Sequence, residues 1–198
     1  MILYGRFLSP FVRRAAIWLA LQERSFEHRP LAVMDDYDAL RAVNPVGRVP
    51  ALVLDDGSVL IETWAIVDWL EDTAPAGRRL LPATGLARRE ALQDVAIAHN
   101  VAEKAVALVY EVPRRPAEFH YGDWIARLRG QVAAGLDLLE QTASRISLEG
   151  APGSVAAAVA SYDFTAHMFR DLAGGRPALA ALSASANAHP AFARSALR

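Results

Sequence analysis

Residues 46–57 read VGRVPALVLDDG and place a proline directly before a short apolar run. The run 51–54 has the composition of a buried strand, and the DDG that follows it predicts a hairpin with residues 59–62, since Asp-Gly suits the positive φ angles of tight turns. Proline cannot donate to a strand ladder and is normally found at strand starts, edges or bulges. Pro50 therefore either begins an edge strand after a trans bond, or follows a cis bond that turns the main chain of Val49 away from the sheet.

Short strand and helix patterns alternate around this hairpin. The spacing of apolar residues predicts strands at 2–4 and 25–33, helices at 9–24 and 35–43, and a third helix from Thr63. The expected order of the first part is therefore βαβ, a helical connector, then ββα.

Strand patterns end after residues 74–85, a stretch rich in proline and glycine that reads as a linker. Helical spacing dominates the rest of the chain, at 86–112, 121–146 and 153–175, followed by an alanine-rich tail that should be helical in pieces. The sequence predicts a small α/β unit followed by an all-helical one.

Composition narrows the function classes. The 198 residues carry a net charge of −1, with arginines spread along the chain and Lys104 as the single lysine, which argues against a nucleic-acid partner. The absence of cysteine excludes disulfides, zinc–thiolate sites and a nucleophilic thiol of the protein itself. The five histidines show no ligand-like spacing, so we expect no metal. The amino terminus does not read as a secretory signal and no apolar window is long enough to span a membrane, which favours the cytoplasm.

Two motifs stand at expected helix starts. Ser9-Pro10 is typical of an N-cap followed by proline at the first helical position, and a hydroxyl there could also hold an anion or a thiolate. Thr63 is an expected N-cap and Glu62 can simply be solvated. Together, however, a hydroxyl, free N–H groups and a carboxylate could bind the head group of an amino acid.

The ordered motifs SPFVRR (9–14), NPVGRVPALVLDDG (44–57) and IETWAIVDWL (61–70) resemble the glutathione-binding half of soluble glutathione transferases of the serine/cysteine type. The resemblance implies an α/β thioredoxin-like N-terminal domain (βαβαββα) over 1–76, a linker at 77–84 and an all-α domain over 85–198. It also implies a homodimer with a role in detoxification, using glutathione as co-substrate against a small hydrophobic electrophile.

The same resemblance assigns roles to individual residues. Ser9 matches the catalytic position whose hydroxyl hydrogen-bonds the glutathione sulfur, and a cis bond is implied before Pro50. Glutathione-binding roles fall on Arg48, Val49, Pro50, Glu62 and Thr63, although Arg48 could equally be a solvated side chain. The family's second-substrate pocket corresponds to the first long helix, where His99, Asn100, Glu103 and Tyr110 are candidates and also plausible surface or core groups. Arg13 and Arg14 are expected on the helix surface or at an interface.

The free energies of a hydrogen bond and of a helix N-terminus are large enough for Ser9 to help ionise a bound thiol. A free thiol ionises near pH ~8.5. A hydrogen bond to a charged group contributes roughly 1.5–3 kcal/mol and a helix start roughly 0.3–1 kcal/mol, together about one to three pKa units. Such a shift would make most of the bound sulfur thiolate at neutral pH.

One departure from the family pattern lies in the helical half. The family usually has a hydroxyl residue followed three positions later by aspartate, as a capping box, whereas Ser154 is followed at that spacing by Ala157. Two functions remain open: an enzyme, which is a transferase or a related glutathione-dependent isomerase, dehalogenase or peroxidase, and a non-catalytic glutathione-binding or regulatory member of the fold.

Overall fold

The computed structural model describes residues 1–197, which divide into two compact units. The first unit comprises Met1–Ala83 together with the tail from Asn187 onward, and the second comprises Thr84–Ala186. Within the described residues, none of the helices combines the length and apolar character needed to cross a membrane.

Four short strands form the sheet of the first unit: β1 (Ile2–Tyr4), β2 (Glu27–Arg29), β3 (Ala51–Val53) and β4 (Val59–Ile61). Their spatial order is β2-β1-β3-β4; β1 pairs parallel with β2 and antiparallel with β3, and β3 pairs antiparallel with β4. The predicted hairpin is confirmed, and at its tip Gly57 alone has a positive φ, of 85°.

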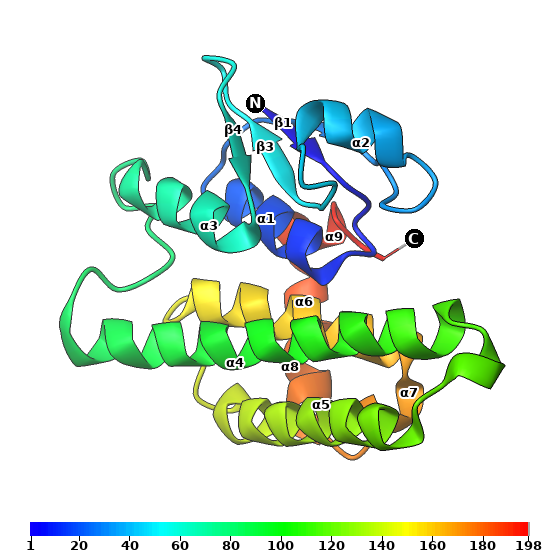
Figure 1. The fold of residues 1–198 in the computed structure, drawn as a ribbon. Coiled ribbons are helices and arrows are strands. Elements are labelled where there is room, and N and C mark those ends of the chain that lie inside the picture. Colours follow the sequence, from blue (N-terminus) through cyan, green and yellow to red (C-terminus); the bar gives the residue numbers. More distant parts are fainter. Residues whose placement is uncertain (198) are drawn as a thin grey trace. The chain divides into compact units, whose positions relative to one another are not determined.

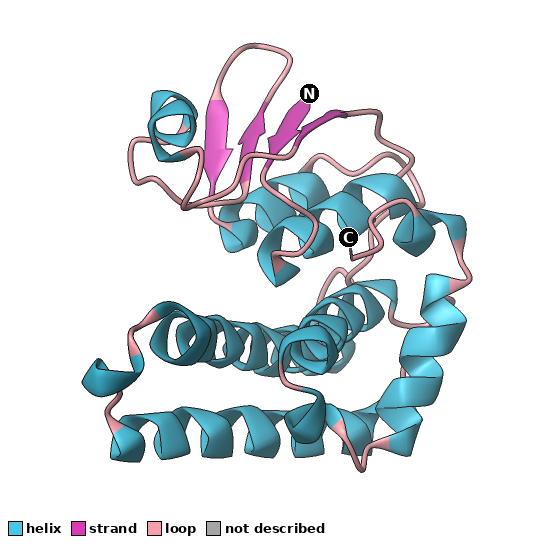
Figure 2. Cartoon of the chain, turned by 90° about the vertical axis from the view of Figure 1, so that its right-hand side faces the viewer, coloured by secondary structure: helices cyan, strands magenta, loops and turns pink. Residues whose placement is uncertain are grey.

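Three helices complete this sheet: α1 (Pro10–Leu21), α2 (Tyr37–Val43) and α3 (Thr63–Asp72). α1 and α3 pack side by side next to the sheet, while α2 lies apart from them (Figures 1 and 2). The element order β1-α1-β2-α2-β3-β4-α3 confirms the expected thioredoxin-like domain.

A buried carboxylate joins α1, α3 and the chain that follows α3. Glu71 is 3% exposed and accepts hydrogen bonds from Trp18 Nε1 at 2.8 Å and Gln22 Nε2 at 3.2 Å, both from the end of α1. It also accepts from the main-chain N–H groups of Leu80 and Leu81, at 3.0 and 3.1 Å. One side chain of α3 therefore satisfies four buried donors, two from the end of α1 and two from the connecting segment.

The tail belongs to the first unit although it follows the second in sequence. α9 (Pro190–Ala193) packs against α1. Arg13 of α1 donates through Nε to Ser195 O at 3.0 Å and through Nη2 to Asn187 Oδ1 at 2.6 Å. Arg13 and Arg14 are both buried, so of their two predicted positions the exposed helix surface is wrong, and a position at an interface stays a prediction. Apolar spacing on α1 did not reveal that the tail covers part of this helix.

The second unit is helical, as expected. Its longest helices are α4 (Gly85–Val109) and α5 (Gly122–Ala143), and α4 packs along both α5 and α6 (Pro152–Met168) (Figure 1). The remaining elements are a π-helical turn (Tyr110–Arg114), a 3-10 turn (Ala117–Phe119), α7 (Arg170–Ala173) and α8 (Pro177–Asn187). The helix predicted over 153–175 is interrupted, because Phe169 leaves helical geometry with φ −142° and ψ 70°.

α6 is buried around most of its circumference because it is built from alanine, valine and small polar residues. Its N-cap is Ala151, followed by Pro152 at the first helical position, so Ser154 does not occupy the capping position expected from the family pattern. The Ser154 hydroxyl is buried and makes no hydrogen bond within residues 1–197. It lies near Asp94 of α4 and favours the ionised form of that carboxyl, which lowers its pKa against the larger effect of burial. Arg145 Nη2 donates to the Asp94 carboxylate at 3.0 Å.

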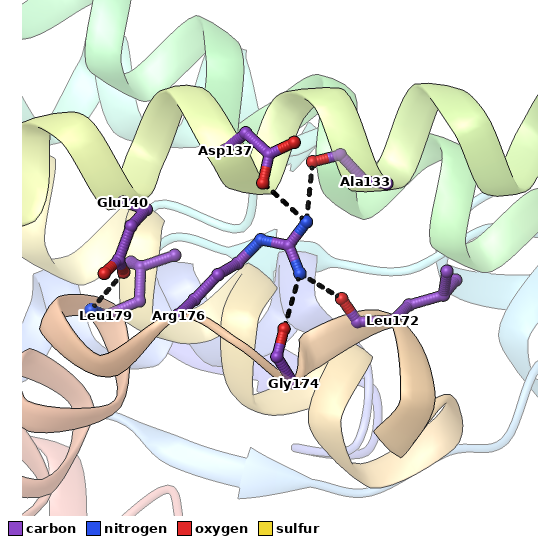
Figure 3. Close-up of polar contacts among 7 residues, drawn as sticks. All are labelled: Ala133, Asp137, Glu140, Leu172, Gly174, Arg176 and Leu179. Carbon is purple, nitrogen blue, oxygen red and sulfur yellow. Dashed lines mark hydrogen bonds and ion pairs between the residues drawn. The ribbon is translucent and has the colours of Figure 1, made fainter.

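Hydrogen bonds also attach the last helices of the second unit to α5 (Figure 3). The Arg176 guanidinium donates to the carbonyl oxygens of Leu172, Gly174 and Ala133 and to the carboxylate of Asp137, at 2.6–3.1 Å. Both oxygens of Glu140 accept N–H groups of the first turn of α8 at 2.8 Å. These contacts tie the segment after α7, and α8 itself, to α5.

Replacing Glu71 with alanine should destabilise the protein by about 2–4 kcal/mol, because four buried donors would lose their acceptor. Urea unfolding measures this loss. Asp72→Ala removes an exposed carboxylate from the adjacent position and is the control, with an expected change below about 0.5 kcal/mol. Equal effects of the two substitutions would contradict the role of Glu71.

Asp94 should make stability depend on pH. Burial raises the pKa of this carboxyl above its ordinary value, and Arg145 and Ser154 only partly oppose the shift. A raised folded-state pKa stabilises the protein below the unfolded-state pKa, and this contribution is lost as pH rises through the raised value. Stability of Asp94→Asn relative to the wild type should therefore increase between about pH 3 and pH 6 in urea unfolding. A difference that does not vary with pH would refute this.

Candidate functional site

Ser9 caps α1. Its Oγ accepts the Val12 N–H at 3.4 Å, and Pro10 occupies the first helical position, as the sequence predicts. A serine hydroxyl can accept one bond and donate its proton elsewhere. Among residues 1–197 no group accepts the Ser9 proton, and the side chain is only partly buried. The hydroxyl is therefore able to donate to a ligand at the N-terminus of α1.

The main chain of Val49 is unpaired. The Val49–Pro50 peptide bond is cis, as the family resemblance implies. Neither the N–H nor the carbonyl of Val49 has a hydrogen-bond partner in the described part of the chain, although the neighbouring strand β3 is fully paired with β1. Val49 thus presents a donor and an acceptor beyond the edge of a regular strand.

Gly5 places Val49 beside the start of α1. Gly5 has φ 119°, and a Cβ at this position would lie 2.5 Å from Val12 Cγ2 and 2.8 Å from Val49 Cβ. Only the absence of a side chain lets the loop after β1 approach both valines. The unpaired main chain of Val49 is therefore held next to the helix turn that Ser9 caps.

A buried asparagine shapes the loop before Val49. Asn44 Nδ2 donates to the Arg48 carbonyl at 2.7 Å, and its Oδ1 accepts the Val46 N–H at 3.0 Å. This is the pattern of an Asx turn, which Asn-Pro sequences favour. Asn44 was not among the predicted site residues, although the NPVG motif contained the signal for its role.

The start of α3 differs from the expectation. Glu62, not Thr63, is the N-cap: its carboxylate accepts the Trp64 N–H at 3.0 Å, and its φ of 72° lies in the left-handed region that non-glycine residues rarely adopt. Thr63 is the first helical residue. Threonine is a preferred N-cap residue and glutamate is not, which is why the sequence favoured Thr63 for this position.

Thr63 is fully buried, and its hydroxyl donates to the Phe11 carbonyl at 3.5 Å, a long hydrogen bond. This contact brings the start of α3 against the first turn of α1. The N–H of Thr63 has no partner within residues 1–197, as is usual for the first turn of a helix. Glu62 itself is exposed, so its carboxylate faces solvent beside this N–H group.

Ser9, Val49, Glu62 and Thr63 are therefore gathered around the first turn of α1 within a single compact unit. Two helix N-termini favour negative charge there, one exposed carboxylate can receive an amine, and the Val49 main chain can pair with an extended peptide. The side chain of Arg48 is exposed on the same loop.

The second-substrate candidates lie in the other unit and are described there alone. His99 and Glu103 are partly buried on α4, whereas the Asn100 side chain is exposed and donates to the Ala96 carbonyl at 2.9 Å. Tyr110 is 44% exposed at the start of the π-helical turn. The structure leaves their role in substrate binding a prediction.

Residues 3–79 match the family described as "Glutathione S-transferase, N-terminal domain". The "Uncharacterized GST-like protein YibF" of Escherichia coli (strain K12) is 30% identical over 142 residues, which are 71% of this chain and 68% of that protein. The chain belongs to the glutathione S-transferase family.

Two further comparisons extend this result. A glutathione transferase family member from Pseudomonas fluorescens Pf-5, solved with bound S-(propanoic acid)-glutathione, has 26% identity, a TM-score of 0.80 and full coverage of both chains. The maleylacetoacetate isomerase of Pseudomonas aeruginosa is 38% identical over 80 residues, and the match spans only 38% of either chain.

A cavity of about 570 Å³ in the first unit is lined by residues of α1, β2 and the tail and contains none of the candidate residues. Large pockets are the usual default for an active site. The unpaired polar groups of Ser9, Val49 and Thr63 instead lie around the first turns of α1 and α3, so we place the candidate site there.

Gly5→Ala should destabilise this family member more than Gly57→Ala. Both glycines have positive φ, but a Cβ at Gly57 meets nothing within 4 Å, whereas one at Gly5 collides with Val12 and Val49. We expect losses of about 1 kcal/mol for Gly57→Ala and about 2–4 kcal/mol for Gly5→Ala in urea unfolding. Equal stability losses would show that Gly5 does not hold Val49 in place.

Proposed function

We propose that this protein is a glutathione transferase that binds glutathione at the start of α1 and activates its thiol for attack on a small hydrophobic electrophile. The observation that carries the proposal is the Ser9 hydroxyl, whose proton has no acceptor within residues 1–197, beside the unpaired main chain of Val49. The relative solved with S-(propanoic acid)-glutathione supports it.

The polar groups of the site match those of the tripeptide. The N–H and carbonyl of Val49 would pair with the cysteinyl unit, as in a strand added to a sheet edge. The γ-glutamyl end would place its carboxylate at the Thr63 N–H and its amine at the Glu62 carboxylate. Since the Thr63 hydroxyl is buried, its contribution comes from the main chain, and Arg48 would reach the glycine carboxylate.

Ser9 would favour the thiolate by donating its hydroxyl proton to the sulfur, while the N-terminus of α1 adds a favourable partial positive charge. The hydroxyl can keep its capping bond to the Val12 N–H, because it accepts that bond and donates the other. The thiol proton leaves to solvent. The sulfur electron pair then forms the new bond to carbon, and the leaving group departs with the pair of the bond that breaks.

A second candidate activity is a glutathione-dependent isomerisation, which the match to a maleylacetoacetate isomerase favours. It would use the same thiolate, add it to the substrate and later expel it, so that glutathione is regenerated. A non-catalytic member of the fold would bind glutathione without turnover. A cytoplasmic location, a role in detoxification and a homodimer are further parts of the proposal.

Ser9→Ala should lower kcat/KM for chloro-dinitrobenzene by about 10- to 100-fold, since the mutant loses one hydrogen bond to a charged sulfur. Affinity for S-methylglutathione, whose sulfur cannot ionise, should stay within about twofold. Steady-state kinetics and calorimetric titration measure the two quantities.

Two further variants separate catalysis from helix capping. Glycine is nearly as good an N-cap as serine but has no hydroxyl, so Ser9→Gly should lose as much activity as Ser9→Ala. Ser9→Thr keeps the hydroxyl and should retain most of it. Unchanged turnover in Ser9→Ala would reject the role of Ser9, whereas retention on immobilised glutathione without activity on a panel of electrophiles and a maleyl substrate would favour the non-catalytic alternative.

A further inference from the structure

The loop between β1 and α1, residues 5–9, ends at Ser9 and has little main-chain attachment to the sheet. At its start the Gly5 N–H donates to the Arg29 carbonyl of β2 at 2.9 Å. At its end the Ser9 N–H donates to the Arg6 carbonyl, within the loop itself, at 3.0 Å. No further main-chain hydrogen bond joins the loop to the sheet in the described part of the chain. Side-chain contacts must therefore fix its course.

His28 of β2 supplies two of these contacts. Its Nε2 lies 2.8 Å from the Gly5 carbonyl oxygen, and since a carbonyl can only accept, the imidazole donates this hydrogen bond. The same imidazole stacks on the ring of Phe7, with ring centroids 3.8 Å apart and planes inclined by 7°. One partly buried side chain therefore binds the first and the third residue of the loop.

The hydrogen bond from His28 restrains a particular peptide plane. Gly5 is already held through its N–H, so the bond to its carbonyl oxygen sets the orientation of the planar peptide group that follows. This plane determines the direction in which the chain leaves β1 toward α1. A rotation of the plane would displace the rest of the loop and, with it, the Ser9 hydroxyl.

The ring contact matters because Phe7 borders an unfilled space. Phe7 and His28 both line a cavity of about 570 Å³ in this unit. A side chain at a cavity lacks partner atoms on that side, so its position depends on the contacts that it does make. The stack on His28 therefore restrains Phe7 where close packing does not.

We propose that His28 is a positioning residue for thiol activation: it holds the loop in the conformation that directs the Ser9 hydroxyl at the sulfur of glutathione. The ligand part of this inference rests on the proposed function. His28 acts through Gly5 and Phe7 and does not itself touch the ligand.

Three substitutions separate the two contacts of His28. His28→Phe keeps the ring stack without the donor, His28→Gln keeps a donor without the ring, and His28→Ala removes both. His28→Ala should lower the ratio of thiolate to thiol in bound glutathione about tenfold at a given pH, measured by thiolate absorbance. It should also lower kcat for chloro-dinitrobenzene by about three- to tenfold. The other two variants should give smaller changes.

Affinity separates this role from a general effect on the site. S-methylglutathione has no ionisable thiol, so its binding to the three variants should stay within about twofold of the wild type in calorimetric titrations. Loss of this affinity in parallel with the thiolate ratio would contradict the proposal, because it would show that the whole site is disturbed.

A double substitution tests whether His28 acts through Ser9. In the Ser9→Ala background, His28→Ala should cause no further change in the thiolate ratio, since the hydroxyl that it positions is gone. An unchanged thiolate ratio in His28→Ala alone, or an equal loss with and without the Ser9 hydroxyl, would overturn the proposal.

His120→Ala is the matched control. His120 Nε2 also meets a main-chain carbonyl, that of Arg115 at 3.0 Å, but in the second unit. This variant should leave the thiolate ratio at the wild-type value. A decrease as large as that of His28→Ala would show that the effect does not depend on the loop that ends at Ser9, and the role of His28 would be rejected.

A measurement without ligand separates this inference from the proposed function. Amide hydrogen exchange at Ser9 reports the bond to the Arg6 carbonyl, and it should become about three- to tenfold faster in His28→Ala but not in His120→Ala. If the wild type left the pKa of the bound thiol at its free value, the proposed function would fail. An unchanged exchange rate at Ser9 would separately refute the role of His28. Should His28→Ala fail to fold, His28→Phe and His28→Gln decide through the same readouts.

Discussion

The first unit depends on a single buried carboxylate. Glu71 receives four hydrogen bonds from the end of α1 and from the segment after α3, and it lies on α3 itself. It thereby fixes the register of α1 against α3. The candidate site is formed where the same two helices begin, at Ser9 and Glu62, so the alignment that Glu71 imposes at one end of the pair positions the chemistry at the other.

Local sequence patterns were sufficient to predict most of the fold. Strand β1, the hairpin around Gly57 and the beginning of α1 were all predictable, because capping residues, Asp-Gly pairs and helical spacing act over a few neighbouring positions. The interruption of the third long helix at Phe169 was not predictable in this way. No proline or glycine marks it, and Phe169 instead packs with Leu108 and Leu128 from two other helices.

Tertiary contacts account for the other differences. The sequence shows that α6 lacks the family's capping box, because Ala157 stands where aspartate is expected. It does not show that the carboxyl near Ser154 belongs to Asp94, which is distant in sequence and lies on α4. Two adjacent arginines on α1 were expected on the helix surface or at an interface, and both are buried within the chain itself. Within the site, the motif spacing identified the residues, whereas the unpaired main chain of Val49 and the burial of the Thr63 hydroxyl required coordinates.

The return of the tail to the first unit has a consequence for biosynthesis. The chain leaves this unit after Ala83 and re-enters it at Asn187, where the tail meets Arg13. At the translation speed of a ribosome, the intervening residues take on the order of ten seconds to make. Throughout that interval α1 lacks its α9 neighbour and the Arg13 guanidinium lacks its partners in the tail, so this surface of the nascent polypeptide stays accessible to chaperones until synthesis finishes.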